Sequence, residues 1–260
     1  SDVYKRQFFR DWQYFNYWGR IPAELIRNGA VIYYGNQQSA QSIEDSAREL
    51  AAQIRTICET TGCEKLNIIA HSKGGLDCRC AIQDFGVQPY VASLTTINTP
   101  HHGCQFVDVL LEKVPATIQN WLAARYNRIF HALGDQKPDF LRGVKDLTQQ
   151  RCQAFLQSHP VGGTVAYMTV MSKMQSIHAA PFPLWLGYLI NKKHGAAEND
   201  GLVPVESAKL EGVPFVMMPK TKKRGISHGD VIDLMRENIP DYDVREWYVQ
   251  FVKRLKENGF

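Results

Sequence analysis

Residues 66–70 of this chain, Leu-Asn-Ile-Ile-Ala, form a short apolar run that leads directly into residues 71–74, His-Ser-Lys-Gly, and then into a helical pattern. A run of this kind is typical of a strand that is buried on both faces. No residues remain for an ordinary loop, so the backbone must turn sharply at Ser72, between the small residues Ala70 and Gly74. This turn favours a fold in which parallel strands pass directly into covering helices.

The rest of the chain repeats this alternation of β-rich runs and amphipathic helices. Strands are expected at residues 30–34, 66–70, 91–97, 165–171 and 213–218, helices at 21–27, 42–61, 73–82, 106–159 and 241–256, and a loop at 179–189. Strands that alternate with helices indicate a mostly parallel central sheet covered on both faces. The length of 260 residues fits one domain, and no internal repeat or interdomain linker is recognisable.

Composition excludes several classes of protein. No apolar run approaches the ~18 residues that a membrane span needs. The net charge of +4 is too small to imply binding of nucleic acid, and the one dense basic run, residues 220–224, is expected in a solvated loop. The six cysteines form no Cys-x-x-Cys pair and are expected as buried thiols, which leaves the redox compartment open.

A serine at a sharp strand-to-helix turn indicates nucleophilic chemistry, which requires a base and an orienting carboxylate. In folds of this kind the chain order is serine, carboxylate, histidine. Asp200 lies in a polar loop after the 165–171 run, and His228 follows the last expected strand. The backbone N–H of Lys73, at the positive end of the following helix, is the expected donor to an oxyanion. The alternative is that Asp200 forms an Asp-Gly turn and that His228 is a helix-capping loop residue.

Four motifs carry a family resemblance. Residues 67–76, Asn-Ile-Ile-Ala-His-Ser-Lys-Gly-Gly-Leu, resemble the nucleophile elbow of bacterial triacylglycerol lipases of the α/β-hydrolase superfamily. Residues 95–103 resemble the T-I-x-T-P-H-x-G segment of these lipases, residues 199–203 their N-D-G-x-V acid loop, and His228 with Asp230 their H-x-D motif. The similarity runs from about Trp12 to the C-terminus.

The resemblance implies a single α/β-hydrolase domain over residues 1–260 and a serine carboxylic-ester hydrolase of the lipase or esterase type. Ser72 is the implied nucleophile, His228 the general base and then acid, and Asp200 the orienting carboxylate. The ester would be cleaved through an acyl-enzyme. The alternatives on the same residues are a thioesterase, a phospholipase or an acyltransferase. An inactive protein of the same fold is a further alternative.

The resemblance also implies where a lipid or acyl-ester substrate binds. The helical block at 106–160 corresponds to the lid of these lipases, and it would make transient contact with a lipid surface. Packing in the core is the alternative for its apolar stripe. The expected pocket residues are His71, Trp121, Leu122, Phe182 and Trp185.

No cofactor or metal is expected. Several of these lipases bind calcium through an aspartate two residues after the catalytic histidine, and Asp230 holds that place. An oxygen ligand is expected four residues later, but Leu234 stands there. One carboxylate does not satisfy an ion that takes six to eight oxygens, so calcium at Asp230 is only the alternative.

The amino-terminal residues depart from the family pattern. Residues 2–7, Asp-Val-Tyr-Lys-Arg-Gln, can be encoded by the mosaic end of a transposon used to prepare sequencing libraries, so residues 1–7 are set aside from the fold; a native strand or tail is the alternative. The His-Gly segment that supplies a second oxyanion donor would precede Phe9. We therefore expect missing first strands, with either a gap between residues 31–34 and 66–70 or residues 3–7 between them. We also expect low stability and weak activity. Localisation stays undetermined.

Overall fold

The computed structural model describes residues 17–35, 41–132, 139–181 and 184–260. Its sheet has four strands in the order β1-β2-β3-β4, and each neighbouring pair is parallel. The strands are β1 Leu66–His71, β2 Val91–Ile97, β3 Ala166–Met171 and β4 Phe215–Met217. Because the strands are parallel, their carboxyl ends meet at one edge of the sheet.

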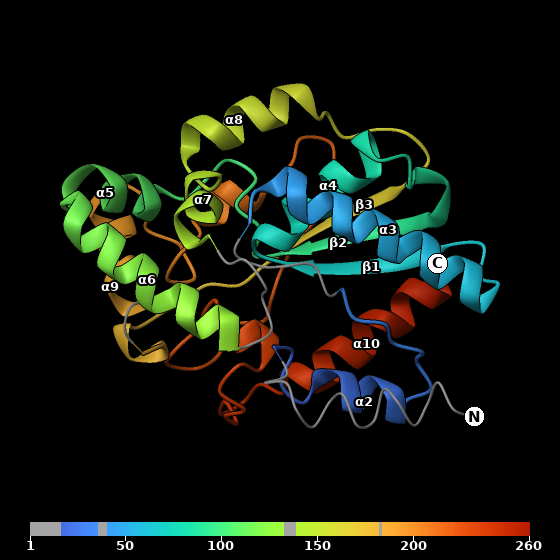
Figure 1. The fold of residues 1–260 in the computed structure, drawn as a ribbon. Helices are drawn as coiled ribbons and strands as arrows, with labels where there is room; N and C mark the ends of the chain where they lie inside the picture. Colours follow the sequence, from blue (N-terminus) through green and yellow to red (C-terminus); the bar gives the residue numbers. More distant parts are fainter. Residues whose placement is uncertain (1–16, 36–40, 133–138, 182–183) are drawn as a thin grey trace.

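Helices cover both faces of this sheet (Figure 1). On one face lie α3 Ile43–Thr61, α4 Lys73–Asp84 and α8 Gln149–Ser158, and on the other α2 Ile21–Arg27 and α10 Val244–Glu257. Each face has its own cluster of buried apolar side chains: Leu76 and Leu94 belong to the first, and Ile97 and Tyr248 to the second. The expected parallel sheet between two helical layers is confirmed.

Helix α3 shows how local sequence sets an element's ends. The Ser42 hydroxyl accepts a hydrogen bond from the backbone N–H of Asp45 at 3.2 Å, which caps the helix. Gly62 ends it with φ of +71°, a conformation that costs glycine little. The apolar side chains of Ala47, Leu50, Ala51 and Ile54, which recur at helical spacing, are buried against the sheet layer. Both ends of this helix were therefore readable from the sequence.

Two predicted elements differ from the structure. Residues 30–35 form no strand, and Val31 is 79% exposed, so the prediction of a strand there is wrong. A β-rich run becomes a strand only when another strand pairs with it, and the described residues offer none here. The expected loop at 179–189 is instead largely helix α9, Leu184–Lys193. The sequence of α9 is rich in leucine and has good helix propensity, and the prolines at 181 and 183 precede its first residue. Residues 3–7 lie outside the described residues.

The helical block after β2 consists of α5 Gln105–Lys113, α6 Ala116–Ala132, α7 Phe140–Lys145 and α8. Helix α8 belongs to the core, because Cys152 and Phe155 pack with α3 and α4. Helices α5 and α6 extend to one side of the sheet (Figure 1), and α6 exposes Ile118 and Trp121. Among the described residues, no helix combines the length and the apolar character that crossing a bilayer requires. The predicted lid segment thus divides into a core helix and an extended part.

The turn between β1 and α4 has the strained geometry that the sequence indicated. Ser72 has φ of +55°, and its backbone N–H donates to the carbonyl of Ile97 at 2.9 Å. The close approach at this turn falls on Gly75, where an added Cβ would lie 2.2 Å from Thr99 Oγ1. At Gly74 an added Cβ meets nothing within 4 Å, so the requirement for a small residue lies one position later than expected.

Replacing Gly75 by alanine is therefore expected to lower the free energy of unfolding by roughly 1–3 kcal/mol, because Thr99 and the helix must move apart. The matched variant Gly74→Ala should change it by less than about 0.5 kcal/mol. Urea unfolding followed by circular dichroism measures both. Equal effects of the two substitutions would contradict the packing at Gly75.

Candidate active site

Four polar residues follow the carboxyl ends of the four strands. Ser72 follows β1 directly, and Asn98 follows β2. Asp200 lies in the loops between β3 and β4, and His228 in the segment after β4. Asn98, Asp200 and His228 are all buried, while Ser72 is partly exposed. The edge at which parallel strands end is where open α/β sheets place their ligands.

A continuous chain of hydrogen bonds joins the three residues singled out by the sequence. His228 Nε2 lies 3.0 Å from Ser72 Oγ, and His228 Nδ1 lies 2.6 Å from Asp200 Oδ2. A carboxylate only accepts, so Nδ1 donates to Asp200, and Nε2 is left to accept from the serine hydroxyl. The backbone N–H of His228 also donates to the carbonyl of Asp200 at 2.9 Å. The structure therefore brings all three side chains together in an order suited to proton transfer.

The carboxylate of Asp200 is held on every side. Its Oδ1 accepts from the backbone N–H groups of Leu202 and Val203 at 2.9 and 2.7 Å. Its Oδ2 accepts from Asn98 Nδ2 at 2.6 Å in addition to His228. Such multiple donation fixes the orientation of this fully buried carboxylate.

A second imidazole lies against His228. The ring centroids of His71 and His228 are 4.4 Å apart, and His71 Nδ1 is 2.7 Å from the Tyr17 hydroxyl. Burial, together with the charge of His228, holds the pKa of His71 well below its usual range. His71 therefore stays neutral beside His228 and restricts the rotation of its ring.

The side chain of Lys73 points away from this chemistry. Its ammonium group pairs with Asp77 at 2.7 Å, one turn along α4, and contacts Ser46 Oγ at 3.2 Å. Lys73 can therefore contribute to a reaction at Ser72 through its backbone N–H, as expected for the first residue of a helix. The second oxyanion donor, expected before Phe9, falls outside the described residues.

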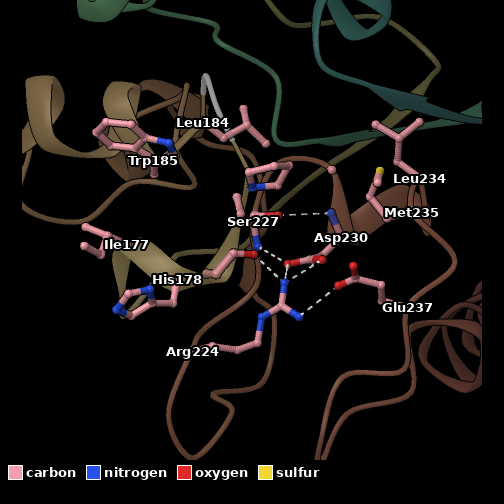
Figure 2. A pocket seen from close by; sticks show the side chains of 14 residues that line it. Ile177, His178, Leu184, Trp185, Arg224, Ser227, Asp230, Leu234, Met235 and Glu237 are labelled. Atoms are coloured by element: carbon pink, nitrogen blue, oxygen red, sulfur yellow. Dashed lines mark hydrogen bonds and ion pairs between the residues drawn. The ribbon is translucent and has the colours of Figure 1, made fainter.

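A cavity of about 600 Å³ lies beside the His228 segment (Figure 2). Ser227 and Gly229 line it on either side of His228, and Trp185 and Leu184 form part of its apolar wall. Of the expected pocket residues, Trp185 lines this cavity, His71 lies against His228 with its ring tilted by 48°, and Trp121 lies exposed on α6. Phe182 and the side chain of Leu122 lie outside what the structure describes.

The surroundings of Asp230 do not fit a calcium ion. Arg224 Nη2 lies 3.0 Å from both carboxylate oxygens, and Oδ2 also accepts from the backbone N–H of Ser227 at 2.8 Å. Arg224 in turn lies 3.6 Å from Glu237 (Figure 2). Leu234 adds an apolar wall to the cavity rather than an oxygen. A guanidinium group thus occupies the position that a cation would need.

Two residues of the site were not found by sequence reasoning. Asn98 orients Asp200, and its positive φ of +50° places its amide between Asp200 and Ser172. Arg224 holds the carboxylate of Asp230, which accepts from the backbone N–H of Ser227, the residue before His228. Asn98 lies within the motif at residues 95–103, but the spacing of that motif does not indicate that Asn98 contacts Asp200. Arg224 belonged to the basic run expected in a solvated loop.

Comparison with known proteins agrees with this geometry. The model of the alpha/beta hydrolase fold family matches residues 30–192. The chain is 30% identical over 159 residues to a triacylglycerol lipase of Pseudarthrobacter phenanthrenivorans, covering 57% of this chain and 49% of that protein. It is 36% identical over 266 residues to triacylglycerol lipase 2 of Saccharomyces cerevisiae, covering 94% and 74% of the two chains. The chain spans about half the length of the bacterial lipases that it matches first.

Solved structures show the same fold. The crystal structure of Staphylococcus hyicus lipase superposes with a TM-score of 0.64 at 18% identity, covering 94% of this chain and 89% of that one. Bacillus licheniformis lipase BlEst2 in its mature form gives a TM-score of 0.62 at 24% identity, covering 84% and 82%. At these identities the likeness concerns the fold alone. The family match and the sequence identities together establish that this chain belongs to the alpha/beta hydrolase fold family and is homologous to bacterial triacylglycerol lipases at about 30% identity.

Proposed function

We propose that the protein is a serine carboxylic-ester hydrolase of the lipase or esterase type, in which Ser72 is the nucleophile, His228 the general base and Asp200 the orienting carboxylate. The observation that carries this proposal is the unbroken hydrogen-bond chain from Ser72 through His228 to Asp200. The family of the chain and its lipase relatives support the class of substrate, an acyl ester with an apolar chain.

The reaction proceeds in two halves on this geometry. Ser72 Oγ attacks the acyl carbon while its proton passes to His228 Nε2, and the negative charge develops on the former carbonyl oxygen near the backbone N–H of Lys73. Collapse of this intermediate expels the alcohol, which takes the proton from His228. Water then gives a proton to His228 and attacks the acyl-enzyme, and the fatty acid leaves as Ser72 regains its proton. Asp200 holds the imidazole in the required tautomer throughout.

The extended part of the helical block supplies a surface for lipid. Helix α6 exposes 60% of Trp121 and 48% of Ile118, and apolar side chains of this size in water favour contact with another apolar phase. We assign α5 to α7 the role of a cover over the acyl chain, next to the edge that carries Ser72. The cavity lined by Trp185 is the second apolar surface near His228.

Replacing Trp121 by alanine is expected to lower the ratio of kcat/KM for long-chain over short-chain esters by roughly 10-fold, since a lost apolar contact of about 1.4 kcal/mol changes a rate ratio tenfold. Turnover of a short p-nitrophenyl ester should hardly change. Ile26→Ala, which removes an exposed apolar residue from α2, is the control. Equal losses on all chain lengths would assign Trp121 to packing instead.

Labelling with a fluorophosphonate tests the proposed nucleophile. The reagent should phosphonylate Ser72 with loss of fluoride, as mass spectrometry of the peptide would show, and His228→Ala should slow the labelling strongly. A folded protein without an adduct at Ser72 would contradict every serine-enzyme assignment. A series of p-nitrophenyl esters, thioesters and phospholipids then identifies the acyl donor, and preference for a thioester or phospholipid would replace the lipase assignment.

A further inference from the structure

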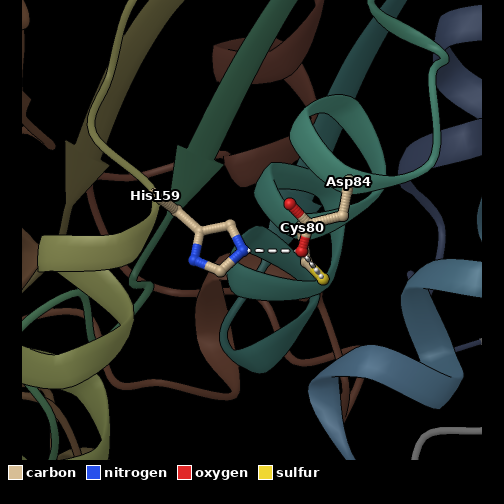
Figure 3. A group of neighbouring side chains, drawn as sticks. All are labelled: Cys80, Asp84 and His159. Atoms are coloured by element: carbon tan, nitrogen blue, oxygen red, sulfur yellow. Dashed lines mark hydrogen bonds and ion pairs between the residues drawn. The ribbon is translucent and has the colours of Figure 1, made fainter.

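A thiol, a carboxylate and an imidazole meet at the opposite end of α4 from Ser72. Cys80 and Asp84 are one turn apart on α4, and His159 directly follows α8 (Figure 3). One ligand atom from each of the three residues lies within 4.8 Å of the other two. Asp84 Oδ2 is the shared point, 2.8 Å from His159 Nε2 and 3.6 Å from Cys80 Sγ.

The hydrogen bonds of the second ring nitrogen show where the proton of His159 lies. Nδ1 is 3.1 Å from the carbonyl oxygen of Phe155 and 2.8 Å from the hydroxyl of Ser158, which itself donates to the carbonyl of Ala154. A carbonyl oxygen only accepts, so Nδ1 carries a proton. A neutral ring then presents the lone pair of Nε2 to the carboxylate of Asp84. The 2.8 Å contact between Nε2 and Oδ2 therefore needs a cation between the two atoms, which is either a second ring proton or a metal ion.

We propose that Cys80, Asp84 and His159 bind a zinc ion, with water as the fourth ligand. Zinc takes thiolate sulfur at about 2.3 Å and carboxylate oxygen at about 2.0–2.2 Å, which in a tetrahedral site separates the two by about 3.5 Å. The sulfur and Oδ2 are already 3.6 Å apart, whereas Nε2 and Oδ2, now 2.8 Å apart, would separate to about 3.3 Å when zinc binds. The contact from Nδ1 to the Phe155 carbonyl is the outer interaction that zinc-binding histidines make.

Charge and access also suit this ion. Arg79, which is fully buried, donates to the carbonyl of His159, so an unbalanced positive charge here would be repelled. A thiolate and a carboxylate together neutralise Zn²⁺, and the complex adds no net charge beside Arg79. Asp84 keeps 49% of its side chain exposed, which gives the ion and its water a path from solvent. The zinc would join the carboxyl end of α4 to the end of α8, away from the proposed esterase chemistry.

Metal titration of the full chain, after removal of metal with a chelator, tests the proposal. We expect one equivalent of Zn²⁺ to bind and Co²⁺ to give a thiolate-to-cobalt charge-transfer band with tetrahedral visible bands. Cys80→Ser should abolish the charge-transfer band, and His159→Gln should weaken zinc binding at least about 10-fold. The matched controls Cys63→Ser, at a half-buried thiol, and His194→Gln, at an exposed histidine, should behave as wild type.

Circular dichroism of each metal-free variant establishes that it is folded. Should Cys80→Ser unfold, Asp84→Asn at the exposed carboxylate provides the same test, and loss of one-to-one binding supports the site. A folded wild-type chain that binds no zinc would overturn the proposal, as would a charge-transfer band that persists in Cys80→Ser. The cluster would then be an imidazolium–carboxylate pair with a neighbouring thiol.

Discussion

Alanine at Ser72 or at His228 is expected to lower kcat/KM for ester hydrolysis by roughly 10⁴- to 10⁶-fold. Without the hydroxyl no acyl-enzyme forms, and without the imidazole the serine keeps its proton, since the hydroxyl is 3.0 Å from its base. Because the residues act as a unit, the double variant Ser72→Ala/His228→Ala should be hardly slower than either single variant. Steady-state hydrolysis of a p-nitrophenyl ester, with the concentration of each purified variant taken from its absorbance, measures this.

The control for this result is His194→Ala, which removes an exposed imidazole at the end of α9 and should leave kcat/KM within a factor of two or so. Thermal unfolding of each variant separates a catalytic effect from loss of the fold. Full activity in Ser72→Ala would exclude the proposed nucleophile. Losses that multiply in the double variant would show that the two residues do not share one step.

Asn at position 200 is expected to cost roughly 10⁴-fold in kcat, through the wrong tautomer of His228. In the native site Oδ2 accepts from both His228 and Asn98. In Asp200→Asn, the amide nitrogen would take the place of Oδ2. Its N–H groups would face the N–H group of Asn98 Nδ2 at 2.6 Å, and they would face the N–H at His228 Nδ1 as well. The backbone donors of Leu202 and Val203 could still be satisfied by Oδ1, so the loop itself should remain in place.

The kcat of Asp200→Asn, measured over a range of pH, provides the test, and Asp241→Asn at an exposed carboxylate is the matched control. Asn98→Asp in the Asp200→Asn background would restore a donor–acceptor pair between positions 98 and 200, but it would leave an amide N–H facing His228 Nδ1 and should not recover the lost rate. Undiminished turnover of Asp200→Asn would mean that another carboxylate orients His228.

Local sequence patterns were sufficient to predict those strands and helices whose structure depends mainly on residues nearby in the sequence. The strands β1 to β3 are short runs rich in apolar and β-branched residues, and α3 has a serine cap, an apolar stripe and a glycine end. The run at 31–34 has the same strand propensity as β1, but pairing depends on a neighbour that no local pattern specifies. Propensity alone therefore could not distinguish the two runs.

The candidate site divides in the same way. Ser72, Asp200 and His228 could be predicted because a serine turn, an acid loop and a late histidine follow one another in a fixed order. The partners that hold them could not, since Asn98 contacts Asp200 from a different strand end, and Arg224 reaches Asp230 within a segment whose path no local pattern specifies. The crowding at Gly75 likewise depends on where Thr99 of the next strand's loop lies.

The order of the strands has a consequence for the protein during its own synthesis. Each strand pairs with the one made just before it, so the sheet can grow as the chain leaves the ribosome, amino end first. The serine turn is finished early, but its imidazole arrives only after β4, the last strand to be made. A nascent chain therefore carries an unreactive hydroxyl, and the proposed esterase activity appears only when the segment after β4 has folded.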